Sequence, residues 1–222
     1  MIHLEQVSKR YGDKTALDHT NLNMPQGAMA FLTGHSGAGK STLLKLIMLM
    51  EQPSSGRVVV DQQDLSKLQG NQIALHRRKI GLVFQNHQLL DDYSVYDNIA
   101  LPLKVSGYNN RDAGRRVRAA LDKVGLLSKE KQLPKVLSTG EQQRIGIARA
   151  IVNKPRLILA DEPTGNLDPK LSAEIMQLFE QFNQVGVTVL IASHDLNLIE
   201  ALPHPKIHLH QGHISGAFAG GA

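Results

Sequence analysis

The segment from Gly34 to Ser41 matches the pattern G-x-x-x-x-G-K-[ST] at every fixed position. Glycines let consecutive backbone N–H groups point toward an anion, and a helix starting here directs the positive end of its dipole to the same place. Lys40 adds a full charge for the β and γ phosphates of a nucleotide, and the Ser41 hydroxyl is placed to bind Mg²⁺. The pattern predicts a phosphate-binding loop with the candidate ligands Gly34, His35, Ser36, Gly37, Ala38, Gly39, Lys40, Ser41 and Thr42.

Two adjacent carboxylates, Asp161 and Glu162, follow the apolar run Leu157-Ile158-Leu159-Ala160, which has the length of a buried strand. Ligands of α/β proteins bind at the carboxyl ends of strands, so the pair is expected where a nucleotide would lie. The Asp161 carboxylate suits Mg²⁺, directly or through water, because hard cations prefer oxygen ligands. Glu162 is placed to polarise a water molecule aimed at the γ-phosphate, and is the candidate general base.

Short apolar strands and amphipathic helices alternate along the chain, and these elements must position the candidate residues. Met29–Thr33 leads into the phosphate-binding loop, and Leu157–Asp161 and Val187–Ala192 are two further buried strands. The stretches from Lys40 to about Met50 and from Ala173 to Val185 have the apolar faces of helices. Strands that alternate with helices predict an α/β fold with a sheet that is parallel at its centre.

The stretch from about residue 86 to residue 136 has a different, helical character. Its clearest part, Arg111–Leu127, places apolar side chains on one face and arginines mostly elsewhere. We interpret the arginines as a solvated helix face, with a lipid-binding or partner-binding surface as the alternative. We predict one domain over residues 1–215 with this helical lobe inserted, followed by a disordered tail of residues 216–222.

Composition and charge narrow the class of protein. The 222 residues have a formal net charge of +5 and include no cysteine, which excludes disulfides and thiolate metal sites. No run of about 18 apolar residues occurs, so no segment is expected to span a bilayer. The start, Met1-Ile2-His3-Leu4-Glu5, lacks the basic and apolar regions of a signal peptide. A role at a membrane would therefore depend on a partner.

Several motifs in the same order resemble those of the ABC ATPase family, and the resemblance spans nearly the whole chain. Besides the phosphate-binding loop and the acid pair, Leu137-Ser138-Thr139-Gly140-Glu141-Gln142 resembles the family's signature segment. The family's Q-loop glutamine, D-loop, switch histidine and adenine-stacking aromatic residue are similar to Gln85, Asn166-Leu167-Asp168, His194 and Tyr11. The resemblance implies a P-loop NTPase cassette of the α/β class, with a mixed, centrally parallel sheet, an N-terminal antiparallel β part and an inserted helical lobe.

The resemblance implies a reaction, the Mg²⁺-dependent hydrolysis of ATP to ADP and phosphate, and it implies residue roles. Glu162, His194 and Gln85 would be catalytic, and the metal ligands would be Ser41, Gln85 and Asp161. His194 can donate a hydrogen bond to the γ-phosphate or hold the attacking water. Gln85 can bridge the metal or that water, and it directly precedes the helical lobe.

The resemblance also implies which residues contact the adenine base and which contact the γ-phosphate from a second copy. Tyr11 would stack on adenine, because an aromatic ring can stack on any base. Ser138 and Gly140 would bind the γ-phosphate held by a second copy, so an ATP-dependent homodimer is expected. Thr139 departs from the family, which usually has glycine there; a β-branched residue loses access to positive φ and adds bulk. Either this position needs no glycine, or contact with the second copy's nucleotide is weakened.

Within the family, the segments Phe31–Lys40, Ala119–Leu127 and Ala160–Asp168 are most similar to a branch that acts in bacterial cell division. That branch implies an integral membrane partner, regulation of cell-wall hydrolases, and a peripheral position on the cytoplasmic side of the inner membrane. The ATPase of a lipoprotein-releasing or macrolide exporter is the alternative, because those cassettes are very similar. A clamp on DNA or ribosomes is disfavoured, because such proteins fuse two cassettes or insert long coiled coils; no nucleic-acid partner is expected.

Overall fold

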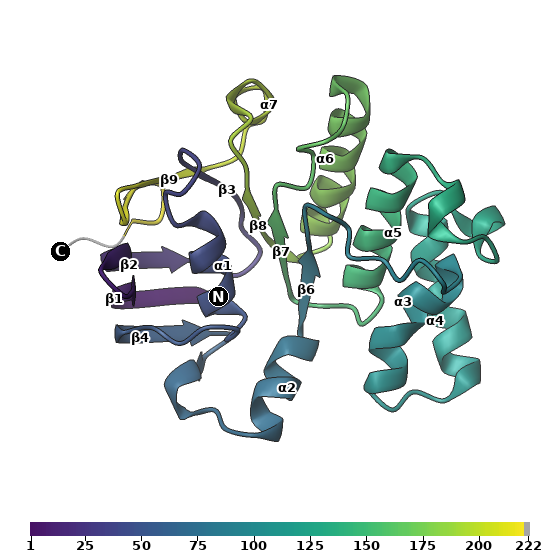
Figure 1. Ribbon diagram of the computed structural model, residues 1–222, viewed down its shortest axis with the longest axis horizontal. Coiled ribbons are helices and arrows are strands. Elements are labelled where there is room, and N and C mark those ends of the chain that lie inside the picture. Colours follow the sequence, from purple (N-terminus) through teal and green to yellow (C-terminus); the bar gives the residue numbers. More distant parts are fainter. Residues whose placement is uncertain (220–222) are drawn as a thin grey trace.

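The computed structural model describes residues 1–219. Figure 1 shows antiparallel strands and the first helix on one side of a central sheet, with the longer helices on the other. The strands are β1 (Ile2–Tyr11), β2 (Lys14–Met24), β3 (Met29–Thr33), β4 (Ser55–Val60), β5 (Gln63–Asp64), β6 (Ile80–Val83), β7 (Leu157–Asp161), β8 (Thr188–Ala192), β9 (Lys206–His210) and β10 (His213–Gly216). The α-helices are α1 (Lys40–Ile47), α2 (Asn71–Arg78), α3 (Val95–Val105), α4 (Asn110–Lys123), α5 (Thr139–Ile151), α6 (Pro169–Gln184) and α7 (Leu196–Glu200). Within the described residues, no helix is both long enough and apolar enough to cross a bilayer.

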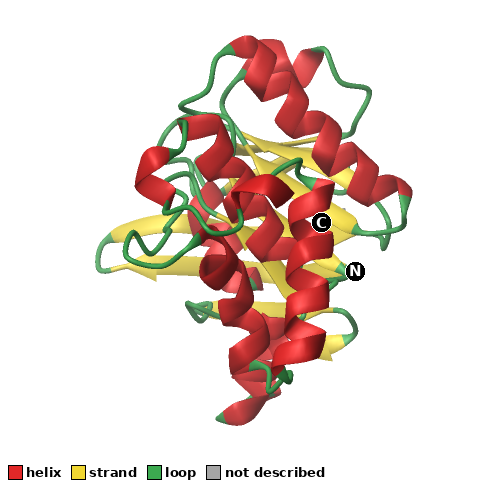
Figure 2. Ribbon diagram, turned by 90° about the vertical axis from the view of Figure 1, so that its right-hand side faces the viewer, coloured by secondary structure: helices red, strands yellow, loops and turns green. Residues whose placement is uncertain are grey.

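The strands of residues 1–219 form two sheets. Four strands pair in the order β2-β1-β4-β5, all antiparallel, and six strands pair in the order β10-β9-β3-β8-β7-β6. In the six-stranded sheet every pair is parallel except β9 with β10. Parallel strands need long crossover connections, and helices form most of the layer that covers the strands in Figure 2. A mixed, centrally parallel sheet beside an antiparallel sheet confirms the predicted α/β architecture.

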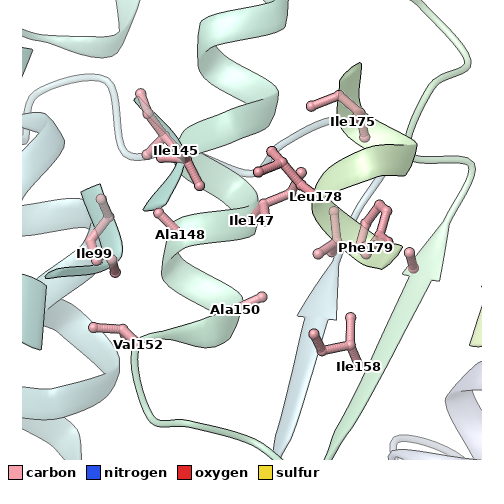
Figure 3. Packing of buried hydrophobic residues seen from close by; sticks show 14 of the residues in the cluster. Ile99, Ile145, Ile147, Ala148, Ala150, Val152, Ile158, Ile175, Leu178 and Phe179 are labelled. Atoms are coloured by element: carbon pink, nitrogen blue, oxygen red, sulfur yellow. The ribbon is translucent and has the colours of Figure 1, made fainter. Parts of the chain in front are cut away.

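The six-stranded sheet separates two hydrophobic cores, because successive side chains of a strand point to opposite faces. In β7, Ile158 lies in the core shared with α3 to α6, and Leu159 lies in the core shared with α1 and the antiparallel sheet. Figure 3 shows the first core, where Ile147 of α5 and Phe179 of α6 pack beside Ile158. The side chains of Ile147, Ile158, Leu159 and Phe179 are fully buried. Burying one apolar side chain stabilises a fold by about 1.5–3 kcal/mol. The sheet is therefore a firm base for the loops at its edge.

Three helix boundaries differ from the expected ones for local reasons. α1 ends at Ile47 rather than near Met50, two residues before Leu49, whose φ of 53° a helix cannot continue. α6 begins at Pro169 rather than near Ala173, because the Asp168 carboxylate accepts the first free backbone N–H groups of the helix. α4 ends at Lys123 rather than near Leu127, because Gly125, which follows the C-cap Val124, has a φ of 71° that a helix cannot continue.

The lobe expected between about residue 86 and residue 136 contains α3 and α4. Both helices pack on α5, so the lobe shares the first core with the sheet. The start of α3 is tied to the end of the lobe, because the N–H groups of Val95 and Tyr96 donate to the carbonyls of Gln132 and Glu130 at 2.8 Å each. The lobe therefore packs directly on α5 and continues the layer of helices to which α5 belongs.

The residues after β10 return to the antiparallel sheet. The Asn23 N–H donates to the Phe218 carbonyl at 2.8 Å, and Ala219 forms a single bridge to Leu22 of β2. This order differs from the disordered tail expected from residue 216 onward. Phe218 packs against the second core, which offsets the conformational entropy lost on ordering the segment. Residues 220–222 of the expected tail lie outside the described residues.

Candidate active site

A cleft of about 860 Å³ opens at the carboxyl ends of β6, β7 and β8, between the first turn of α1 and the β1–β2 hairpin. The predicted site residues that line it are Tyr11, His35, Ser36, Gly37, Gly39, Lys40, Ser41, Thr42, Gln85, Asp161, Glu162 and His194. Four other predicted residues do not line this cleft: Gly34, Ala38, Ser138 and Gly140. The parallel register of the sheet thus brings together groups that are more than 100 positions apart in the sequence.

The phosphate-binding loop turns tightly against its neighbours. A Cβ added to Gly39, whose φ is 110°, would lie 2.5 Å from the Ala16 carbonyl oxygen. A Cβ added to Gly34 would lie 2.3 Å from the Leu209 carbonyl oxygen. Neither position has room for a residue with a side chain. Gly34 and the buried Ala38 therefore form the base of the loop, while its other residues form the wall of the cleft.

Lys40 is the buried cation at the bottom of the cleft, with 7% of its surface exposed. Its Nζ donates to the carbonyls of Gly34 at 2.8 Å and His35 at 3.4 Å, and lies 3.6 Å from Glu162 Oε1. The contacts to the loop carbonyls hold the ammonium group beside the backbone that would surround a phosphate. Because charges interact more strongly away from bulk water, this cation is well placed to bind an anion.

Glu162 occupies a strained backbone position at the end of β7. Its φ is 49°, an uncommon value for a residue with a side chain, and its N–H donates to the Ala192 carbonyl at 2.9 Å. Its carboxylate lies between Lys40 and His194, with Oε1 2.8 Å from His194 Nδ1 and Oε2 accepting the His194 backbone N–H at 3.3 Å. Strain of this kind clusters at functional sites, where the surrounding contacts maintain it. The arrangement can hold a carboxylate ready to take a proton from a water molecule in the cleft.

The oxygen ligands predicted for Mg²⁺, from Ser41, Gln85 and Asp161, all line the cleft. Within the described residues, no group of three or more histidine, cysteine, aspartate or glutamate side chains could hold a metal ion alone. This donor set fits Mg²⁺, which typically binds one or two carboxylates and takes its other ligands from phosphates and water. A metal that arrives with a nucleotide therefore suits this cleft.

The β1–β2 hairpin forms the outer wall of the cleft. Tyr11 is 41% exposed, and Lys9 Nζ lies 4.8 Å from the centre of its ring, so the outer part of the ring is available for a base. Three lining residues were not predicted: Lys14, Ala16 and Lys45. Lys14 pairs with Tyr11 across the hairpin, and Lys45 follows Ser41 by one helical turn. These two spacings were visible in the sequence, whereas the approach of Ala16 to the loop is a tertiary contact.

The signature segment begins α5, away from this cleft. Ser138 is the N-cap of the helix: its Oγ accepts the Glu141 N–H at 3.3 Å, and its own N–H donates to Glu141 Oε2 at 3.0 Å. Thr139 is the first helical residue, is exposed, and does not have a positive φ. A Cβ at Gly140 would lie 3.0 Å from Leu171 of α6. Packing against the Leu171 side chain therefore favours a small residue at position 140, and the helical backbone has no need of glycine at position 139.

We expect Thr139→Gly to change folding little, because the helical backbone at this position suits both residues. Loss of helix propensity should lower the free energy of unfolding by less than about 1 kcal/mol. Turnover of ATP should stay within about threefold of the parent, which corresponds to a change of less than about 0.7 kcal/mol in the activation free energy. Urea unfolding and phosphate release measure the two effects. A tenfold gain in turnover would instead mean that the threonine side chain hinders the signature segment.

The fold and the cleft together define a P-loop cassette built to bind a nucleotide. A family model described as "ABC transporter" matches residues 17–165, well over half of the chain. The chain therefore belongs to the ABC transporter family, which confirms the family resemblance found in its motifs.

Particular relatives are similar over almost the whole length. The chain is 56% identical over 217 residues to the cell division ATP-binding protein FtsE of Escherichia coli strain K12, covering 97% of this chain and 98% of that protein. The dimeric structure of MJ0796, a bacterial ABC transporter cassette, has a TM-score of 0.87 and 36% identity, with 97% of each chain covered. A post-hydrolysis dimer of MJ0796 bound to ADP and phosphate has a TM-score of 0.87 and 34% identity over the same shares of the two chains.

Proposed function

We propose that the chain binds ATP in the cleft and hydrolyses it to ADP and phosphate. Lys40 and the surrounding loop bind the β and γ phosphates, Glu162 removes a proton from the attacking water, and His194 orients that water or the γ-phosphate. Gln85 links the reacting end of the nucleotide to the helical lobe. The capture of ADP and phosphate in a similar cassette supports this reaction.

The observation that carries the proposal is the position of the Glu162 carboxylate. It lies 2.8 Å from His194 Nδ1 and 3.6 Å from Lys40 Nζ, and its side chain is 13% exposed. A carboxylate between the phosphate-binding cation and a histidine can activate water beside the γ-phosphate. Phosphate release from ATP by the purified chain tests the proposal; a rate no higher than that of Glu162→Gln would contradict it.

We propose Mg²⁺ as the metal that accompanies ATP, held by Ser41 and Asp161, with Gln85 bound to it directly or through water. When bound, it would neutralise charge that develops on the phosphates. The protein's own task is to orient these oxygen atoms and to place Lys40 opposite them. ATP turnover should therefore require added Mg²⁺ and stop in the presence of a chelator.

We further propose that two copies pair on ATP, each placing Ser138 and Gly140 against the nucleotide of the other. Neither residue lines the cleft of its own chain, although the start of α5 is a helix N-terminus that can bind an anion. The dimeric structures of the similar MJ0796 cassette support this pairing. The complete site would thus use the cleft of one copy and α5 of the other.

Removing the side chain of the N-cap Ser138 should show whether this residue contributes only to the stability of the fold or also to ATP-dependent dimerisation. Ser138→Ala and Asn109→Ala each remove an N-cap side chain, of α5 and α4, and each should cost about 1 kcal/mol of stability. Only Ser138→Ala should weaken ATP-dependent dimerisation, by at least about tenfold, since a hydrogen bond to a charged group contributes about 1.5–3 kcal/mol. Sedimentation with ATP in a Glu162→Gln background measures the pairing. Equal dimerisation by both variants would contradict a role for Ser138 at the second nucleotide.

We propose that the biological task is bacterial cell division, in which the ATPase cycle drives an integral membrane partner resembling FtsX and regulates cell-wall hydrolysis. The chain would then lie at the cytoplasmic face of the inner membrane, attached through that partner. Its similarity to FtsE over 97% of its length supports this reading. A groove of about 420 Å³ between α2, α3 and α5 offers a docking surface, with exposed Leu101 and Val105 beside Arg77 and Arg78.

Purification of the chain with its partner from detergent-solubilised membranes tests this task. Recovery of an FtsX-like membrane protein with the division machinery would support it, and Val105→Asp in the groove should reduce that recovery. Recovery with the membrane subunit of an exporter, together with ATP-dependent export by the reconstituted complex, would contradict it.

A further inference from the structure

The loop that follows β6 is fastened to α5 by Arg149. The Arg149 guanidinium donates from Nη2 to the His87 carbonyl and from Nη1 to the Gln88 carbonyl, at 2.6 Å each. His87 and Gln88 have φ values of 46° and 47°, and the left-handed region costs a residue with a side chain about 1–2 kcal/mol. Such a loop keeps its shape only while neighbouring contacts maintain it. Arg149 supplies two of those contacts.

The partners of the Arg149 guanidinium are carbonyl groups rather than a carboxylate. Burial lowers the pKa of Arg149, and no charged neighbour in the described chain opposes this effect. Arg149 is partly buried, and an arginine withdrawn from water is normally paired with an anion, because an isolated charge is costly to remove from water. Here the paired carbonyl dipoles of the loop take that place, so the guanidinium and the loop stabilise each other.

The same face of α5 meets the loop along two helical turns. Gln143, Gly146 and Arg149 are three residues apart and so lie on one side of the helix. A Cβ at Gly146 would lie 4.0 Å from the His87 carbonyl oxygen. His87 Nδ1 and Gln143 Nε2 are both buried without a hydrogen-bond partner in the described residues. The loop therefore lies against this face of α5 from Gln143 to Arg149.

α5 carries functional groups at both ends. Ser138, its N-cap, belongs to the wall proposed to contact the nucleotide of a second copy, and Arg149 lies about 16 Å further along the helix. Gln85, three residues before Gln88, lines the cleft of the same chain. Because a helix moves as a nearly rigid body, a shift of its first turn is carried to the loop through Arg149.

We propose that Arg149 is a positioning residue that holds the loop of residues 85–88 against α5. A movement of the N-terminal end of α5, which carries the signature segment, then changes the position of Gln85 in the cleft. This inference rests on the proposed two-copy ATPase. It gives the chain a physical link between the nucleotide in its own cleft and the nucleotide that its α5 contacts on the second copy. Arg149 itself touches neither nucleotide.

The test compares Arg149→Met with Arg149→Lys. Methionine keeps a long side chain but has no charge and no hydrogen-bond donors, whereas lysine keeps the charge but lacks the planar guanidinium group. Arg111→Met, at an exposed arginine of α4, is the matched control. The purified Arg149→Met chain should lose about 10- to 100-fold in kcat, as expected for displaced catalytic groups, while the KM for ATP changes less than about threefold. Arg149→Lys should recover part of the rate, and Arg111→Met should match the parent.

A double-mutant cycle shows whether Arg149 acts through Gln85. The variant Gln85→Ala combined with Arg149→Met should be no slower than Gln85→Ala alone, because residues that act as one unit are not additive. Losses that multiply, or parental kcat in Arg149→Met, would overturn the proposal.

Amide hydrogen exchange in the Glu162→Gln background separates this inference from the proposed function, because it needs no turnover. ATP should slow exchange in peptides covering residues 34–42 and 84–90 of the otherwise unaltered chain. With Arg149→Met, residues 34–42 should still respond and residues 84–90 should not. Equal responses of residues 84–90 in both chains would overturn the role of Arg149. No response of residues 34–42 in either chain would instead contradict nucleotide binding in the cleft.

Discussion

Glu162→Gln is expected to bind ATP as tightly as the parent chain or more tightly, and to lose at least about 100-fold in turnover, a typical contribution of general base catalysis. Glutamine has nearly the shape of glutamate and still accepts the His194 N–H, which lies 3.3 Å from Glu162 Oε2. It cannot take a proton from water, and it removes a negative charge 3.6 Å from Lys40 Nζ. Phosphate release and binding of a fluorescent ATP analogue measure the two effects.

The same variant should accumulate as an ATP-bound dimer, because ATP that is not hydrolysed keeps the two copies together. Glu180→Gln is a matched control, since Glu180 Oε1 lies 3.0 Å from His204 Nε2 and neither residue lines the cleft. That variant should keep parental turnover. Turnover of Glu162→Gln at the parental rate would mean that another group is the base. A monomer in saturating ATP would contradict the proposed pairing.

Lys40→Ala should lose ATP affinity by about 100-fold or more, because hydrogen bonds between charged groups contribute about 1.5–3 kcal/mol each and a triphosphate offers this cation more than one oxygen. The lysine is 7% exposed, so water cannot readily replace its charge. The loss should appear as weaker binding rather than only as slower hydrolysis. Isothermal titration with Mg-ATP measures it.

Lys45→Ala is the control for the loss of one positive charge in α1. Lys45 also lines the cleft but is exposed and makes no contact with the loop carbonyls, so its removal should weaken binding by less than about fivefold, as for an exposed ion pair. Thermal unfolding of both variants shows whether Lys40→Ala remains folded after its contacts with Gly34 and His35 are lost. Parental affinity in folded Lys40→Ala would contradict the assignment of the phosphate-binding loop.

The local features of the fold were predictable because their causes are local. The phosphate-binding loop is eight consecutive residues whose glycines and lysine act together, and it lies where the sequence predicts it. The buried strands were visible as apolar runs, and Leu157–Asp161 has the bounds that the sequence predicted. α2 was missed because its residues, Asn71–Arg78, are largely polar and only His76 among them is buried.

The position of Glu162 was predicted only in part. Its place at the end of a strand followed from the sequence, but its positive φ and its contacts with Lys40 and His194 did not. Those contacts depend on the parallel register of β7 and β8, which sets Asp161 opposite Ala192. A pairing register is a long-range property, and shifting it by one residue would point the side chains to the other face.

By itself, the sequence determined the family, the phosphate-binding loop and the strands and helices with clear apolar patterns, because each depends on the type and spacing of neighbouring residues. Only the tertiary structure decided that Thr139 lies in a helix, where glycine is not needed, and that Phe218 orders the segment beyond β10. It also decided that Arg149 holds the loop of residues 85–88, although Gln88 and Arg149 are 61 positions apart in the sequence. Contacts of this length arise from how whole elements pack, and no local pattern encodes them.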